Sequence, residues 1–163
     1  MKSLVDLEKK INSELTTKIN DSKMNHGQLY IEIDSEDLLD VSLFLKTNKD
    51  TKFRQLIDIT AVDYPEKTKR FKLVYLFLSH EFNQRILINY FINENEVVPT
   101  LTKIFPSANW MEREVFDMYG VKFKDHPDLR RILTDYEFDG YPLRKDFPLT
   151  GKFEVRYSEE KKK

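Results

Sequence analysis

Hydrophobic and polar residues alternate along the first part of the chain in patterns that predict helices and strands. Apolar residues at positions 4, 7, 11, 15 and 19 follow the three-and-four spacing of one helical stripe, so we predict a helix over 3–19. Residues 20–27 are polar and end in glycine, and residues 29–33 form a short run typical of a strand. A second helix is expected over 34–46, because Asp34-Ser35 supplies an N-cap.

Three longer strands follow. Residues 54–62 (RQLIDITAV) alternate between two unequal faces, and residues 71–79 (FKLVYLFLS) are almost continuously apolar, as in a central strand. The turn at 63–67 (DYPEK) predicts that these two strands pair as an antiparallel hairpin. Residues 85–92 (RILINYFI) supply a further strand.

The later elements are shorter. Pro99 is placed to begin a helix that runs to Phe105. Asn109 and Glu112 fit a capping arrangement at the start of another helix, which Gly120 would end. Together the elements predict an α+β fold, a two-layer α/β sandwich with a mixed, largely antiparallel sheet. We expect this domain to span 1–124 and an extended, irregular C-terminal arm to span 125–163.

Composition narrows the possible partners. The chain has 163 residues, of which 40% are hydrophobic and 13% aromatic, enough for one domain with a tail. With 27 basic and 28 acidic residues, its net charge of −1 gives no pull toward nucleic acid or an anionic membrane surface. It has no cysteine, so it offers no thiolate for an iron–sulfur cluster. No apolar run resembles a secretory signal or a membrane span, so membrane association would depend on another protein.

The segment 109–153 is dense in charge, with eight basic and nine acidic residues. Its first part, 125–133, has an acidic cap followed by proline, which predicts a helix entry. Of the adjacent Arg130 and Arg131, we expect one to bind a partner carboxylate and the other to tie the tail to its own domain. Beyond residue 133, aromatic and leucine anchors alternate with charges and two prolines, which predicts an extended arm. The arm either wraps a partner or folds over its own domain.

Two arrangements suggest chemistry. Glu114 and Asp117 are three residues apart on one helix face and could form the general acid/base pair of a hydrolase. We favour partner contacts and surface ion pairs, such as Arg113 with Asp117, because proton-transfer catalysis also needs a pocket and matched pKa values. His126 with Asp125 and Asp128 could hold a metal ion, but we expect no metal site because the other two histidines lie in separate turns. The chain has no glycine-rich phosphate loop and no signature of an RNA-stacking sheet.

Two long runs carry a resemblance to a known family. The runs 112–133 (EREVFDMYGVKFKDHPDLRRIL) and 140–149 (GYPLRKDFPL) resemble the signature of the 30 kDa-type subunit, or C subunit, of respiratory complex I, the proton-pumping NADH:quinone oxidoreductase. The α+β pattern of the first hundred residues also fits the amino-terminal domain of that family. The resemblance therefore covers essentially the whole chain.

The resemblance implies a non-catalytic subunit of the peripheral arm that holds no cofactor itself, while FMN and iron–sulfur clusters lie in partner subunits. It places the chain beside the quinone-site and terminal-cluster subunits, at the cytoplasmic side of the bacterial inner membrane or the matrix side of the mitochondrial one. Because the chain ends at Lys163, we expect a free-standing version of the subunit. The residues that the resemblance assigns to the partner interface are Glu112, Arg113, Glu114, Asp117, Tyr119, His126, Asp128, Arg130, Arg131, Tyr141, Arg144, Lys145, Asp146 and Phe147.

Other functions stay open from the sequence. Related subunits occur in ferredoxin-driven, chloroplast-type quinone reductases and in membrane-bound hydrogenase complexes, where the electron donor is not NADH. An assembly factor that binds one subunit transiently would have similar surface chemistry. A stand-alone hydrolase that uses Glu114 and Asp117 is the alternative from a different class.

Overall fold

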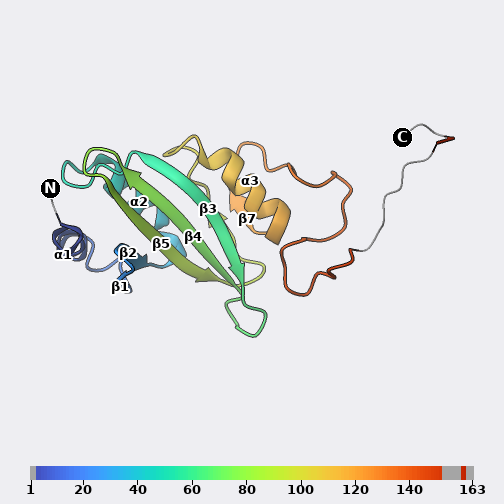
Figure 1. The fold of residues 1–163 in the computed structure, drawn as a ribbon, viewed down its shortest axis with the longest axis horizontal. Coiled ribbons are helices and arrows are strands. Elements are labelled where there is room, and N and C mark those ends of the chain that lie inside the picture. The colour runs from blue at the N-terminus through green and yellow to red at the C-terminus, as the bar shows by residue number, and fades with distance from the viewer. Residues whose placement is uncertain (1–2, 152–158, 161–163) are drawn as a thin grey trace.

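The computed structural model describes residues 3–151 and 159–160, and it has the predicted α+β architecture (Figure 1). Every strand expected from the sequence is present, and three more strands occur that were not expected. In chain order the elements are α1 (Leu4–Glu14), β1 (Asp21–Asn25), β2 (Gln28–Glu32), the 3-10 turn η1 (Ser35–Asp37), α2 (Leu38–Thr47), β3 (Gln55–Asp63), β4 (Phe71–Ser79), β5 (Gln84–Ile92), β6 (Val97–Pro99), α3 (Ala108–Tyr119) and β7 (Lys122–Lys124).

The main sheet has five strands in the order β1-β2-β5-β4-β3. Strands β3, β4 and β5 pair antiparallel, as do β1 and β2, whereas β2 and β5 run parallel. This confirms the predicted mixed, largely antiparallel sheet and the β3–β4 hairpin. A separate pair, β6 and β7, runs parallel.

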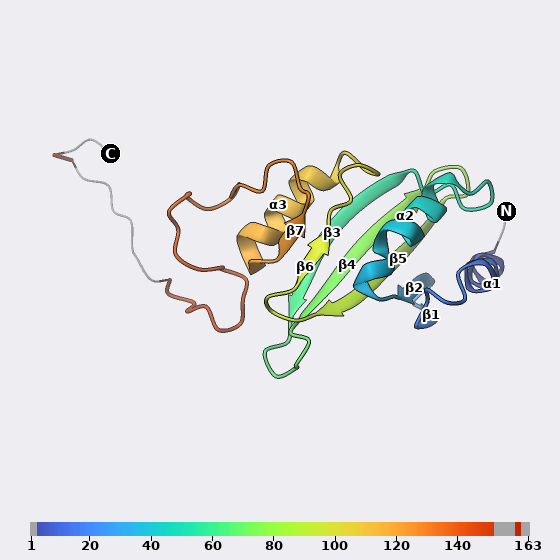
Figure 2. The ribbon, with the colours of Figure 1, turned by 180° about the vertical axis from the view of Figure 1, so that it is seen from behind.

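The helices leave one face of the main sheet uncovered. In Figure 2 the helix α2 lies in front of β4 and β5, whereas Figure 1 shows the same strands from the other side with no helix across them. Helix α3 lies beside the edge strand β3 in both views. Within the described residues, no helix is both long and apolar enough to cross a membrane.

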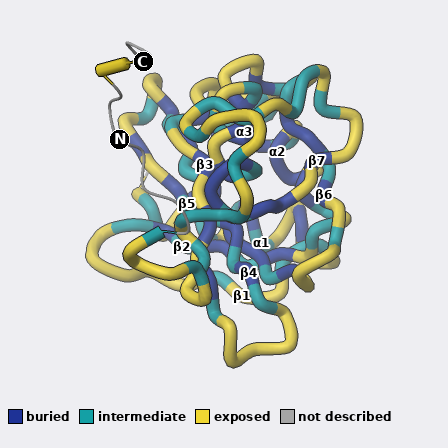
Figure 3. Tube along the Cα trace, turned by 90° about the vertical axis from the view of Figure 1, so that its right-hand side faces the viewer, coloured by how far each residue is buried: buried dark blue, intermediate teal, exposed yellow. Residues whose placement is uncertain are grey.

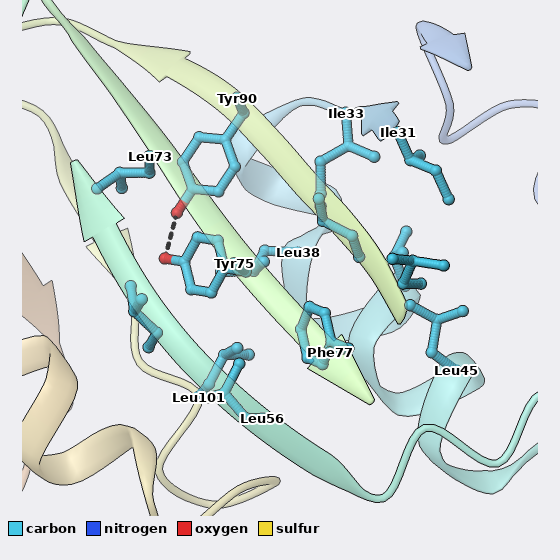
Figure 4. Close-up of a cluster of buried hydrophobic side chains, with 14 of the residues drawn as sticks. Ile31, Ile33, Leu38, Leu45, Leu56, Leu73, Tyr75, Phe77, Tyr90 and Leu101 are labelled. Atoms are coloured by element: carbon cyan, nitrogen blue, oxygen red, sulfur yellow. Dashed lines mark hydrogen bonds between the residues drawn. The ribbon is translucent and has the colours of Figure 1, made fainter. Parts of the chain in front are cut away.

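The core lies between the sheet and α2. Leu38 and Leu45 of α2 are fully buried there with Tyr75, Phe77 and Tyr90 of the sheet (Figure 4). The hydroxyls of Tyr75 and Tyr90 lie 2.8 Å apart, so that one donates a hydrogen bond to the other. Burial raises the pKa of both phenols, so both stay protonated.

The N-terminal region differs from the prediction in two places. Helix α1 begins with the Ser3 capping box but ends at Glu14 rather than residue 19; Ile19 still packs on the core from the following loop. The polar segment 20–27 is not a simple loop, because Asp21–Asn25 forms the edge strand β1. The turn to β2 has positive φ at His26 (47°) and Gly27 (73°), a backbone that joins tight hairpins.

Three further predictions were wrong. Residues 99–105 do not form a helix: Pro99 belongs to β6, and Leu101 to Phe105 make a single turn. The capping pair of Asn109 and Glu112 does not form, because the Glu112 carboxylate accepts hydrogen bonds from Thr100 and Leu101 instead. Residues 125–133 are not helical, since the backbone N–H groups at 132–134 bind the side chain of Asp117.

Candidate functional site

The last turn of α3 holds a buried carboxylate that organises the chain after it. Asp117 has 0% exposure. Its Oδ2 atom accepts hydrogen bonds from three successive backbone N–H groups, those of Ile132 (2.9 Å), Leu133 (2.7 Å) and Thr134 (3.0 Å). Its Oδ1 atom accepts from Arg131 Nη1 (2.7 Å) and from the Thr134 hydroxyl. Three consecutive donors on one oxygen bend the backbone around the carboxylate, which is why the predicted helix does not form.

The protonation state of Asp117 follows from these contacts. Burial alone would raise its pKa, because it disfavours the charged form. The hydrogen bonds from Thr134, Leu133 and Arg131 outweigh burial and hold the pKa below its usual range. Asp117 is therefore an ionised structural anchor and a poor proton donor at neutral pH.

Arg131 pairs with Asp117 and extends the anchor along the arm. Its Nη2 atom donates to the carbonyl oxygens of Phe138 (2.9 Å) and Gly140 (3.0 Å). Its guanidinium carbon also lies 5.2 Å from the ring centroid of Tyr141. One side chain thus ties residues 138–141 to the C-terminal end of α3, as expected for one of the two arginines. Arg130, in contrast, is exposed and forms a bidentate pair with Asp128.

A second arginine holds the arm where α3 ends. Arg144 donates from Nε to the Tyr119 carbonyl (2.6 Å) and from Nη1 to Glu94 (2.5 Å). Its guanidinium stacks over Tyr141, with 4.5 Å between the guanidinium carbon and the ring centroid. Gly120 ends α3 with φ +81°, and a Cβ atom there would lie 2.6 Å from the Tyr141 ring. Glycine is thus required both by the backbone and by the close approach of the arm.

The β3–β4 turn supplies the third attachment. Asp63, at the end of β3, accepts two hydrogen bonds from Arg70 (2.7 and 2.9 Å) and one from the backbone N–H of Lys145 (2.8 Å). The hydrogen bonds from Arg70 lower the pKa of Asp63, which therefore stays ionised. Arg70 also pairs with Asp146 at 2.9 Å. Residues 145 and 146 are thus docked on the turn of their own sheet.

The start of α3 contains a different carboxylate. Glu112 has 0% exposure and accepts hydrogen bonds from the Thr100 hydroxyl (2.5 Å) and the Leu101 N–H (2.7 Å). Burial raises the pKa of Glu112 to about 7 even though these donors oppose the shift. The Nε2 atom of His126 lies 3.8 Å from this carboxylate. Burial lowers the pKa of His126, so the imidazole is neutral and does not supply a countercharge.

The contacts of the His126 ring argue against a metal site. Its Nε2 atom donates to the Asn109 carbonyl (3.1 Å), and its Nδ1 atom accepts from the Asp128 N–H (3.0 Å). The one lone pair of the neutral imidazole is thus already occupied. In the described part of the chain, no group of three or more His, Cys, Asp or Glu side chains is arranged to hold a metal ion.

The acid/base pair considered from the sequence is not assembled. Glu114 is exposed, whereas Asp117 is buried and both of its oxygens accept hydrogen bonds from the arm. Arg113 does not pair with Asp117, as the sequence suggested, but donates to the carbonyl oxygens of Arg130 (3.0 Å) and Arg131 (3.5 Å). The side chains of α3 thus position the backbone of the arm.

The fourteen residues that the sequence assigned to a partner interface fall into two groups. One group has contacts inside the chain, and all of its members except Glu112 help to hold the arm on its own domain. Its buried or half-buried members are Glu112, Arg113, Asp117, Tyr119, His126, Arg131, Tyr141 and Arg144. Phe147 is half-buried and stacks on Phe138, with 5.8 Å between ring centroids. The side chains that reach solvent are Glu114, Asp128, Arg130, Lys145 and Asp146. Contact of these residues with a partner stays a prediction.

Sequence reasoning missed several members of this arm-anchoring cluster. Asp63, Arg70 and Glu94 bind the arm although they lie in the sheet and its turns. A signal was present, since a charged pair flanks the β3–β4 turn, but such pairs usually lie in solvent and contribute little.

The outward side of the arm carries four large apolar side chains among its exposed charged residues. Leu133 is 62% exposed, Tyr136 72%, Leu143 50% and Leu149 106%. Figure 3 shows exposed positions along the loops of the arm and buried ones concentrated in the strands and α3. Trp110 on α3 is also exposed, with the Arg113 guanidinium carbon 4.9 Å from its ring centroid. Large exposed apolar side chains held on an ordered backbone are typical of a protein–protein interface.

Comparisons with known proteins match this architecture. The C subunit of the NADH-quinone oxidoreductase of Ruegeria pomeroyi is 56% identical over 84% of this chain and 68% of its own length. The corresponding C subunit of Parvibaculum lavamentivorans is 49% identical over 99% of this chain and 80% of its own length. The chain therefore spans between about two thirds and four fifths of the length of these relatives.

Solved structures agree. A trypsin-resistant fragment of Nqo5 superimposes with a TM-score of 0.63 at 27% identity, over 76% of this chain and 98% of the fragment. A polypeptide of an archaeal respiratory membrane complex, the membrane-bound sulfane sulfur reductase, superimposes with a TM-score of 0.75 at 27% identity, over 98% of this chain and 97% of its own length. The family model for the respiratory-chain NADH dehydrogenase 30 Kd subunit matches residues 31–153. The chain therefore belongs to the respiratory-chain NADH dehydrogenase 30 kDa subunit family.

Proposed function

We propose that this chain is a structural, non-catalytic subunit in the peripheral arm of a proton-translocating NADH:quinone oxidoreductase. In this role it holds the quinone-reducing module together while electrons pass from NADH to quinone. The observation that carries the proposal is the C-terminal arm: it is fixed to its own domain by Asp117, Arg131 and Arg144, yet it presents Tyr136 and Leu149 to solvent.

The energetics of the arm support a docking role. An irregular segment loses conformational entropy when it becomes ordered. If the arm were not attached to its own domain, the free energy of binding to a partner would have to offset that loss. Here the loss is offset inside the chain by charge-assisted hydrogen bonds. A pre-ordered apolar surface binds more tightly than the same side chains on a free chain.

The partners that we propose are the quinone-site subunit and the subunit that holds the terminal iron–sulfur cluster. FMN and the clusters would lie in those and other partners, which agrees with the lack of cysteine in this chain. The chain would reach the membrane only through these subunits, at the cytoplasmic side of a bacterial inner membrane or the matrix side of a mitochondrial one. It would bind no nucleic acid, given its balanced charge.

The test is purification of the tagged chain from membranes of the source cell in mild detergent, with scoring of co-purified subunits and NADH:quinone reductase activity. The test variant replaces Tyr136, Leu143 and Leu149 with serine, all on the outward side of the arm. Leu43→Ser is the control, because Leu43 is a large apolar side chain on α2 with the same exposure as Leu143, 50%. We expect the triple variant to fold but to lose co-purification, and the control to retain it. Equal recovery of both variants would refute the docking role of the arm.

A complex with a different electron donor is the second candidate. Its support is the similarity, with a TM-score of 0.75, to a polypeptide of an archaeal sulfane sulfur reductase complex. Recovery of quinone-module subunits without NADH oxidation would favour this candidate. An assembly factor would be absent from the mature, active complex. The hydrolase candidate loses its support, because Glu114 and Asp117 do not share a site.

A further inference from the structure

The face of the main sheet that no helix covers is apolar at its centre. Its central apolar side chains, here called the open face, are Tyr30, Val74, Leu76, Leu78, Leu87 and Phe91, and one buried polar residue, Asn89, lies among them beside Val74. They are contiguous, because Leu76 pairs directly with Leu87 across β4 and β5, and Leu87 pairs with Tyr30 of β2. Each of these apolar side chains is half-buried by its neighbours.

This composition is unusual for a sheet face in contact with water. An antiparallel sheet with one solvated face normally alternates apolar and polar residues along each strand. In β4 the buried residues Leu73, Tyr75 and Phe77 alternate instead with the half-buried Val74 and Leu76. Strand β4 thus has the sequence of a strand that is covered on both faces. The described part of this chain covers only one face of it (Figures 1 and 2).

One end of the open face carries a cluster of lysines. The ammonium groups of Lys67 and Lys72 lie 4.6 and 5.4 Å from the ring centroid of Phe91. Lys23 of β1 pairs with Tyr30 and so lies on the same face. Burial lowers the pKa of Lys72, and the nearby charges of Lys23 and Lys67 lower it further, while Glu32 opposes them.

The three lysines place positive charge at this end, and Lys69, which lines the pocket there, adds to it. Among the described residues, none of Lys23, Lys67 and Lys72 forms an ion pair with a carboxylate, and Glu32 is the one carboxylate whose charge raises the pKa of Lys72. A pocket of about 270 Å³ opens here, lined in part by Glu32, Lys67 and Phe91. The open face thus combines a largely apolar centre with a cluster of lysines at one edge, where Lys67 and Lys69 line the pocket together with Glu32 and Asp34.

We propose that the open face is a second docking surface, which binds a protein segment with apolar side chains followed by carboxylates. The apolar residues of that segment would cover Leu76 and Leu87, and its carboxylates would reach the lysines around Phe91. A protein fits better than an anionic membrane surface, because the lysines occupy one end only and Asp58 is exposed on the same face, where it pairs with Leu76. The surface uses no residue of the arm. This proposal rests on the proposed function in one respect: the segment is expected to belong to another subunit of the complex.

The test uses the assembled complex. The photo-crosslinking residue p-benzoylphenylalanine replaces Leu76 in the tagged full-length chain, and the complex is purified in mild detergent, irradiated and analysed by peptide mass spectrometry. The same crosslinker at Leu43, exposed on α2, is the control position. We expect Leu76 to crosslink to a peptide of another subunit that contains Asp or Glu next to apolar residues. We expect Leu43 not to crosslink to that peptide.

Charge variants test the acidic character of the segment. Lys67→Glu with Lys72→Glu should lower the crosslink yield at Leu76 by about tenfold or more, whereas Lys67→Arg with Lys72→Arg should retain it. A crosslink from Leu76 to a second copy of this chain, to its own C-terminal residues or to lipid would overturn the proposal, as would no crosslink or equal yields in both charge variants. The two proposals fail separately: a chain that co-purifies with the complex but gives no Leu76 crosslink refutes only the open-face proposal, whereas loss of co-purification refutes the proposed function.

Discussion

Glu112 is a buried acid without a countercharge, and its replacement by glutamine tests whether the fold keeps it neutral. The carboxylate accepts from the Leu101 N–H and the Thr100 hydroxyl. Glutamine has the same shape, and its carbonyl oxygen would accept from Leu101 while its amide donated to Thr100. Thr100 would then donate to Thr102, whose hydroxyl is 2.9 Å away. The substitution therefore removes a titratable proton and keeps both hydrogen bonds; the second N–H of the new amide has no partner among these contacts, a cost that does not vary with pH.

The magnitude follows from proton linkage. Burial raises the pKa of Glu112 from 4.5 to about 7 in the folded chain. Below pH 4.5 Glu112 is protonated in both the folded and the unfolded chain, so it does not change the free energy of unfolding with pH. As the pH rises from 4.5 to 7, the unfolded chain loses this proton and the folded chain keeps it, so the folded chain loses stability. At about 1.4 kcal/mol for each pKa unit, the loss reaches about 3 kcal/mol above pH 7.

The assay is urea denaturation of the isolated chain at about pH 5 and about pH 8. We compare the free energy of unfolding of Glu112→Gln with that of the parent chain at each pH. We expect this difference to shift in favour of the variant by roughly 2 kcal/mol on going from about pH 5 to about pH 8. Glu114→Gln, on the exposed side of the same helix, is the matched control and should show no comparable gain. A pH-independent difference for Glu112→Gln would refute the reasoning, because it would mean that Glu112 ionises alike in both states.

Three other substitutions test the anchors and the core. Asp117→Asn should cost about 3 kcal/mol in free energy of unfolding and expose residues 131–141 to limited proteolysis, because a buried guanidinium loses its carboxylate; unchanged proteolysis would contradict this. Gly120→Ala should lower the free energy of unfolding by at least about 1 kcal/mol more than Gly27→Ala, because both glycines have positive φ but only Gly120 faces the Tyr141 ring. Equal decreases in melting temperature for the two variants would contradict this. Tyr75→Phe should lower the free energy of unfolding by about 1 kcal/mol, and adding Tyr90→Phe to that variant should lower it by less than this again, because the hydrogen bond is already gone. Urea denaturation in which the two effects simply add would count against a shared hydrogen bond.

The main strands and helices could be predicted from the sequence because their burial follows a regular period. The strands predicted over 71–79 and 85–92 agree with β4 and β5 almost to the residue, because both segments are nearly continuous apolar runs bounded by turns. Strand β1 was missed because its residues are mostly exposed and polar, so its pairing comes from backbone hydrogen bonds and the turn at Gly27. The short β6 and β7 were missed for a related reason, as three residues show no period.

The errors around α3 have one physical origin. Local rules treat Glu112 as a helix cap and residues 125–133 as a helix, because cap and helix signals depend on neighbours in sequence. In the fold, Glu112 binds Leu101 just beyond β6, and Asp117 binds the backbone of 132–134. These buried carboxylates bind partners 11 to 17 residues away, which no local pattern encodes. The segment that contains them stands out in the sequence by its charge and aromatic content, and its contact with a partner stays a prediction.

The docking role of the arm is tested most directly by a cryo-electron microscopy map of the complex purified through this chain. We expect other subunits to cover Leu133, Tyr136, Leu143 and Leu149 in that map. We also expect Asp117 and Arg131 to keep the contacts to residues 132–140 that they have here. A map with those four apolar side chains in solvent, or with the arm detached from α3, would contradict this role.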